Sequence, residues 1–135
     1  MRPRPLLALL ALAALAAGCR TTQPSNPSPR GDVMVDGTSI LGAWSAVEVV
    51  GDALATRDLA DGTMEQTLIV GSNGRAVLTG VDHRAGGTPV AFTGRITGNR
   101  IQFAGMEGAG VLLMSGRRLI LRDPTGRSTV FARGG

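Results

Sequence analysis

The stretch TPVAFTGRIT (residues 88–97) shows the clearest alternation of side chains in the sequence. In an extended chain, one face would carry Val90, Phe92, Gly94 and Ile96, and the other Ala91, Thr93, Arg95 and Thr97. A period of two predicts an antiparallel strand with one face in a core and the other in water. We therefore expect a β-sheet around this stretch.

Seven further strands are predicted on either side of it, at residues 40–50, 63–70, 75–81, 100–105, 110–115, 118–122 and 127–133. Turn residues separate them, including Asn73-Gly74, Gly98-Asn99 and DPTG (123–126), which suit tight hairpins. The fold class is therefore all-β, an antiparallel meander of about eight strands. Such a meander can close into a small barrel, which removes exposed edges.

The predicted core consists of mid-sized apolar residues that could fill a small barrel completely or leave room for one small molecule. They are Val47, Val49, Leu68, Val70, Leu78, Val90, Phe92, Ile96, Ile101, Phe103, Leu113, Leu119, Leu121 and Val130. The segment GDALATRDLADG (51–62) interrupts the strand pattern, and its apolar residues indicate a short helical turn or lid.

Residues 1–18 have the features of an export signal. Arg2 and Arg4 precede twelve apolar residues from Leu6 to Ala17, too few for a helix that spans a bilayer. Residues 15–19, LAAGC, resemble the lipobox of bacterial lipoproteins.

That resemblance implies cleavage between Gly18 and Cys19, and lipidation of Cys19 with a diacylglyceryl group and further acyl chains such as palmitate. The protein would then be exported and anchored to the membrane of the cell envelope, the outer membrane if the source has two, because Arg20 follows the cysteine. An ordinary secretory signal cut after Ala14-Leu15-Ala16 would instead leave Cys19 as a free thiol.

The predicted organisation has three parts: a signal peptide (1–18), a lipidated N-terminus with a disordered Pro/Ser/Thr linker (19–39), and a barrel domain (40–135). The linker, RTTQPSNPSPRGD at 20–32, would reach ~30 to 40 Å in a polyproline-like conformation.

The barrel domain resembles the lipocalin-like (calycin) barrels through LGAW, residues 41–44. The resemblance implies that Gly42 allows close packing and that Trp44 plugs one end of the barrel. The closing run SGRRLILRDPTGRSTVFAR (115–133) is also similar to the final hairpin of META-type and metalloprotease-inhibitor barrels of small bacterial lipoproteins.

Little in the sequence supports catalysis, a metal, a cofactor or nucleic-acid binding. A catalytic Cys19 would need a base in reach, and the only histidine, His83, lies beside Asp82 in a glycine-rich loop with no nucleophile nearby. Met106 and Met114 could bind copper(I), but methionines in apolar strands are more often core residues. Without Arg2 and Arg4, twelve arginines stand against ten acidic residues, and they form no stripe for a phosphate backbone.

We therefore expect a lipid-anchored envelope protein without enzymatic activity, which binds a small apolar ligand in its barrel or serves at the envelope surface. The alternative is a module that binds another envelope protein, such as an inhibitor of an exported protease. It would act through its tail, the 51–62 segment or the 82–88 loop.

Overall fold

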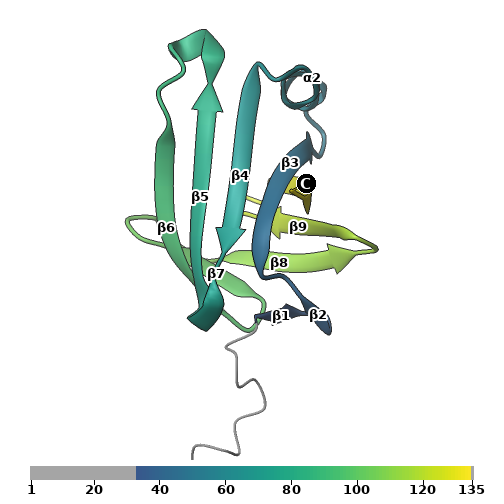
Figure 1. The fold of residues 1–135 in the computed structure, drawn as a ribbon, viewed down its shortest axis with the longest axis vertical. Coiled ribbons are helices and arrows are strands. Elements are labelled where there is room, and N and C mark those ends of the chain that lie inside the picture. The colour runs from purple at the N-terminus through teal and green to yellow at the C-terminus, as the bar shows by residue number, and fades with distance from the viewer. Residues whose placement is uncertain (1–32, 135) are drawn as a thin grey trace, which may run out of the picture. The chain divides into compact units, whose positions relative to one another are not determined.

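The structure is a computed structural model that describes residues 33–134. Eight antiparallel strands form a closed barrel in the order β10-β3-β4-β5-β6-β7-β8-β9 (Figure 1). They are β3 (Gly42–Val49), β4 (Met64–Val70), β5 (Arg75–Asp82), β6 (Val90–Thr97), β7 (Arg100–Phe103), β8 (Gly110–Ser115), β9 (Arg118–Arg122) and β10 (Ser128–Arg133). The other elements are β1 (Met34–Val35), β2 (Thr38–Ser39), α2 (Ala53–Asp61) and the 3-10 turns η1 (Ser72–Gly74) and η2 (His83–Ala85).

The predicted all-β meander is confirmed. Strands that follow one another in the sequence are neighbours in the sheet, and β10 pairs with β3 to close the barrel. All eight predicted strands are present, each within two residues of its predicted ends. Within the segment at 51–62, for which a short helical turn or lid was predicted, Ala53–Asp61 form the helix α2. No helix among residues 33–134 has the length and apolar character needed to cross a bilayer.

The hairpin between β4 and β5 shows how turn residues fix the register. Asn73 and Gly74 have φ values of 65° and 77°, as the Asn-Gly pair predicts. A Cβ on Gly74 would lie 2.6 Å from the carbonyl oxygen of Ile96, so both the conformation and the close approach of β6 require glycine.

The core lies inside the barrel and extends to the segment before β3 through Val33, Val35 and Ile40. Its largest fully buried side chains are Trp44, Phe131, Ile40, Leu68, Ile101, Leu112, Leu119 and Val35. Eight predicted core residues are buried, namely Val49, Leu68, Val70, Ile96, Ile101, Phe103, Leu119 and Leu121. Leu78 and Phe92 are half-buried against them.

Three predicted core residues are replaced by neighbours. The pairing of β3 with β10 is irregular, because Val130 pairs with Glu48 whereas the next residue, Phe131, pairs with Ala46. Val47 is thus the extra residue of a β-bulge on β3 and does not belong to the inward row. Phe131 is buried in the core in place of Val130. In β8, pairing with β9 places Leu112 inside and leaves Leu113 half-buried on the other face.

Val90 was also predicted to be a core residue, but it is 52% exposed. It is the first residue of β6, and that strand begins at the end of the barrel opposite to β1 and β2 (Figure 1).

The fold begins before the predicted boundary at residue 40. Val33 and Val35 are buried, Ile40 donates its backbone N–H to the carbonyl oxygen of Val33 at 2.8 Å, and β1 pairs with β2. Burying these apolar side chains against the barrel stabilises a segment whose neighbours in the sequence are polar. The predicted signal and the rest of the predicted linker lie outside the described residues.

Candidate functional site

The two ends of the barrel differ, and Trp44 is buried at the end that carries β1 and β2. This side chain is 1% exposed, and its Nε1 donates to the carbonyl oxygen of Ile40 at 2.8 Å. The guanidinium of Arg133 stacks on the indole, 4.3 Å from the ring centroid. Arg133 also donates to the carbonyl oxygens of Leu41 and, at 2.7 Å, Ser39. The side chain of Arg133 thus ties β10 to the start of β3 at this end.

Gly42 lies beside this stack. Its φ of 112° belongs to the left-handed region, and a Cβ there would lie 3.3 Å from Nη1 of Arg133. The glycine therefore leaves room for the guanidinium beside the indole.

The opposite end of the barrel is open and carries a pocket of about 390 Å³, which we call the mouth pocket. Its apolar lining comes from Met64, Gly80, Val81, Ala85, Val90 and Phe92, and its polar lining from Glu65, Gln66, Asp82 and Thr88. The size is within the range of small-molecule sites in proteins.

The strand register explains why the pocket is there. The floor of the pocket is lined by Phe92, which belongs to one inward row with Leu78 of β5 and Leu68 of β4 in the core. In the next inward row, Gly80 stands between Gln66 and Val90. Because glycine has no side chain, this row leaves the space above the floor unfilled.

Helix α2 lies at the same end, beside β3 and β4 (Figure 1). The carboxylate of Asp52 caps it by accepting the N–H of Ala55 at 2.9 Å, and Gly62 ends it with a φ of 80°. Thr56 fastens the helix to β3, because its Oγ1 donates to the carbonyl oxygen of Val49 at 3.1 Å and accepts the N–H of the same residue at 3.0 Å.

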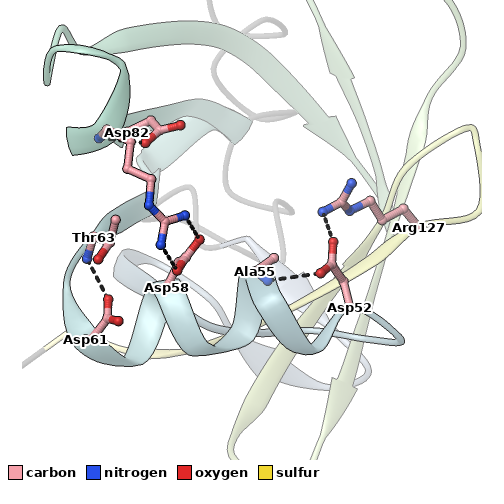
Figure 2. A network of polar contacts seen from close by, with 8 residues as sticks. Asp52, Ala55, Asp58, Asp61, Thr63, Asp82 and Arg127 are labelled. Carbon is pink, nitrogen blue, oxygen red and sulfur yellow. Dashed lines mark hydrogen bonds and ion pairs between the residues drawn. The ribbon is translucent and has the colours of Figure 1, made fainter.

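Two ion pairs join α2 to the loops on either side of it (Figure 2). Arg84 of η2 donates two hydrogen bonds, of 2.6 and 2.8 Å, to the carboxylate of Asp58. The Asp58 side chain is 12% exposed, and its hydrogen bonds and negative charge raise the pKa of Arg84. Arg127, before β10, forms the second pair with Asp52 at 3.0 Å. The helix is thus held in place over the rim of the barrel.

His83 does not pair with Asp82. Its Nε2 lies 2.8 Å from Oε2 of Glu65, and both side chains are at least half exposed. The Asp82 carboxylate instead accepts the backbone N–H of Arg84 at 3.0 Å. Asp82 therefore does not orient the imidazole of His83.

The remaining candidates from the sequence are dispersed or outside the described residues. Met106 is 44% exposed and Met114 is half-buried against the core. Among residues 33–134, no three His, Cys, Asp or Glu side chains gather closely enough to hold a metal ion. Gly18 and Cys19 lie outside this range.

The contacts that shape both ends could not be foreseen from the sequence. Arg84 is 26 positions from Asp58, Arg127 is 75 from Asp52, and Arg133 is 92 from Leu41. Of these three arginines, only Arg127 directly follows a predicted turn, DPTG at 123–126, and that position indicates no partner.

No protein-family model matches the sequence, and no curated protein matches it either. Among solved structures, the fold is similar to that of a lipocalin lipoprotein affecting virulence in Streptococcus pneumoniae, with 12% identity and a TM-score of 0.51. The similarity covers 74% of this chain and 98% of that one. A second structure, of a protein from Streptococcus pneumoniae assigned as a lipoprotein, gives 14% identity and a TM-score of 0.47, covering 72% of this chain and 96% of that one. The closed eight-stranded meander and the first of these similarities show that the chain has a lipocalin-like fold.

Proposed function

We propose that this protein is an exported lipoprotein, anchored to the cell envelope through Cys19, whose barrel binds a small apolar ligand at the mouth pocket without catalysis. The observation that carries the proposal is the mouth pocket, whose lining is mostly apolar.

The exposure of its lining supports a ligand. Val90 is 52% exposed, and Met64 and Phe92 are only half-buried although all three belong to inward rows of the barrel. Covering apolar surface is worth about 25 cal/mol per Å², so an apolar molecule would gain by occupying this space. The polar side chains of Gln66 and Thr88 on the lining would hold the ligand's polar end.

The anchor rests on residues outside the described range. The lipobox-like LAAGC at 15–19 supports lipidation, and one protein of similar fold is itself a lipoprotein. Two or more acyl chains would hold the protein durably on a membrane. If the source has two membranes, Arg20 after the cysteine favours the outer one.

Binding can be tested with the fluorescent apolar probe N-phenyl-1-naphthylamine and the variant Gly80→Leu. A Cβ on Gly80 would lie 3.9 Å from its nearest neighbour, and the residue has no positive φ, so leucine can fill the pocket without backbone strain. The matched control is Gly71→Leu, at the far end of β4, where a Cβ would lie 3.7 Å from the nearest atom.

We expect saturable probe binding to the wild type and to Gly71→Leu, and at least about tenfold weaker binding to Gly80→Leu. Urea unfolding should show that both variants remain folded. Equal affinity in folded Gly80→Leu and wild type would refute the mouth pocket as the site.

The anchor is tested by the intact mass of protein from the membrane fraction. The wild type should carry the mass of the acyl groups on a chain that begins at Cys19, and Cys19→Ser should carry none. A wild-type protein of unmodified mass would contradict the anchor and leave the binding proposal standing.

A second candidate is a module that binds another envelope protein, such as an exported protease. It is favoured by two exposed apolar side chains next to and on α2, Val50 at 53% and Leu54 at 66%. Leu54→Asp should then abolish inhibition or partner binding, whereas Ile69→Asp, at a residue 46% exposed on β4, should not. Inhibition that survives Leu54→Asp would exclude this surface.

A further inference from the structure

The outer wall of the barrel carries a groove that is separate from the mouth pocket. It has a volume of about 590 Å³ and runs over β5, β6 and β7, and we call it the arginine groove. Two arginines, Arg75 and Arg95, line it, and no carboxylate does.

The shape of the groove follows from side-chain length. Arg75, Arg95 and Gln102 form one outward row across the three strands, because Arg75 pairs with Arg95 and Arg95 with Gln102. In the adjacent outward row, Val77 pairs with Thr93. Long side chains in one row therefore stand beside short ones in the next, which leaves a hollow with a wall of guanidinium groups.

The pairing of Arg75 with Arg95 is electrostatically unfavourable by itself. Like charges directly opposite each other on antiparallel strands destabilise a sheet, because their Cβ atoms are only about 5 Å apart. Within residues 33–134, the ion pairs are those of His83, Arg84 and Arg127, so neither arginine of the groove is neutralised there.

Most of the hydrogen-bonding capacity of these two arginines is also unused within the described residues. A guanidinium has five N–H donors. Arg95 donates one hydrogen bond, of 3.2 Å, to the carbonyl oxygen of Asn73, and Arg75 donates none from its side chain. Thr93, whose side chain carries a hydroxyl group, also lines the groove.

From this geometry we propose that the arginine groove binds the phosphate group of an anionic ligand between Arg75 and Arg95. A doubly or singly charged phosphate neutralises the opposed guanidinium groups and accepts several N–H bonds at once, which is the geometry in which arginine binds phosphate best. Thr93 donates a further hydrogen bond from the floor.

The position of the groove favours a lipid headgroup as the source of the phosphate. Arg75 directly follows η1, at the end of the barrel that carries β1 and β2 (Figure 1). Val33, where the described chain begins, is bonded to Ile40 at that same end. If Cys19 is lipidated, only fourteen positions separate the anchor from Val33, so this end can reach anionic headgroups.

The test uses the full-length protein and three soluble probes: inorganic phosphate, dihexanoyl-phosphatidylglycerol below its micellar concentration, and dihexanoyl-phosphatidylcholine as the zwitterionic control. Binding is measured by calorimetry and by the rise in melting temperature relative to chloride at equal ionic strength. The variants are Arg75→Gln/Arg95→Gln and, as a control with the same loss of charge, Arg117→Gln/Arg118→Gln on the β8–β9 hairpin.

We expect saturable binding of phosphate to the wild type and the control, and a loss of at least about tenfold in Arg75→Gln/Arg95→Gln. Tight binding of the phosphatidylglycerol but not the phosphatidylcholine identifies a headgroup site, and binding of inorganic phosphate alone identifies a site for free anions. Undiminished binding in Arg75→Gln/Arg95→Gln, equal loss in the control, or no binding of either anion overturns the proposal.

A second readout does not depend on the probe. In phosphate-free buffer of low ionic strength, the single variant Arg75→Gln should melt at a higher temperature than the wild type, because it removes the opposed charges and leaves the hydrogen bond of Arg95 to Asn73 in place. A lower melting temperature would show that the two arginines are not in conflict and would contradict the argument. The choice of a lipid headgroup rests on the proposed anchor at Cys19, but neither experiment involves the mouth pocket or its probe, so phosphate binding at the groove and ligand binding at the mouth pocket can fail independently.

Discussion

Removing the guanidinium of Arg133 should weaken the end of the barrel that carries β1 and β2. The variant Arg133→Gln loses the stacking on Trp44 at 4.3 Å and two hydrogen bonds to the carbonyl oxygens of Ser39 and Leu41. The cation–π contact is worth about 1 kcal/mol. Because Arg133 is exposed, its charged hydrogen bonds contribute together only about 1 to 2 kcal/mol.

We therefore expect Arg133→Gln to lower the free energy of unfolding by about 2 to 3 kcal/mol. For a barrel of about 100 residues, this corresponds to a fall in melting temperature of roughly 8 to 20 °C. Arg133→Lys should recover less than half of the loss, because an ammonium group cannot stack flat on the indole and donate to two carbonyls at once.

The assay is urea unfolding followed by the fluorescence of Trp44, the only tryptophan, and by circular dichroism, since the variant changes the surroundings of the indole. Arg117→Gln, in the exposed β8–β9 turn, should stay within about 0.5 kcal/mol of the wild type. A loss below 0.5 kcal/mol in Arg133→Gln, or full recovery in Arg133→Lys, would refute the role given to the guanidinium.

Three further outcomes are expected in urea or thermal unfolding. Gly98→Ala should lower the free energy of unfolding by about 1 kcal/mol because of its positive φ alone. Gly74→Ala should lower it by about 1 to 3 kcal/mol more, because its Cβ would lie 2.6 Å from a backbone carbonyl oxygen. Equal losses in the two variants would contradict this close approach. Burial raises the pKa of Asp123, but hydrogen bonds from its own turn outweigh this and lower the pKa below 3.8. The wild type should therefore be more stable than Asp123→Asn near neutral pH and lose that advantage as the pH falls below 3.8. An advantage unchanged at pH 2 would be evidence against these hydrogen bonds. Arg84→Gln should lower the urea midpoint more than Arg84→Gln/Asp58→Asn does, because only the single variant leaves a buried carboxylate without its partner; the reverse order would contradict the ion pair.

The strands could be predicted because their signals are local. Residues 88–97 alternate strictly, and Asn73-Gly74 supplies the positive φ values that its hairpin needs. Where a strand is apolar on both faces, as in residues 110–115, the sequence alone does not determine which side faces the core. Pairing with β9 makes that choice for Leu112.

The β-bulge at Val47 could not be predicted from the local sequence either, because it also depends on strand pairing. It arises from how β3 pairs with β10, and the two strands are some 80 positions apart in the sequence. The buried hairpin at residues 33–40 was missed because two valines between polar and glycine residues carry no periodic signal.

The candidate sites depend on relations between rows of the sheet. The sequence indicated apolar residues at 64, 90 and 92, but only the register places Gly80 between Gln66 and Val90 and so creates the mouth pocket. In the same way, Arg75 and Arg95 each follow a predicted turn or lie on a predicted wet face, and only the pairing of β5 with β6 sets them opposite each other.

The seam between β3 and β10 bears on the order in which the protein can reach its folded state. Strand β3 is made early, and its partner is complete only when Arg133 has been added. Until then β3 has one unpaired edge, and Trp44 lacks the guanidinium that covers it. A chain exported from its N-terminus while it is still being synthesised would therefore enter the membrane before β10 exists, and the barrel could close only on the far side.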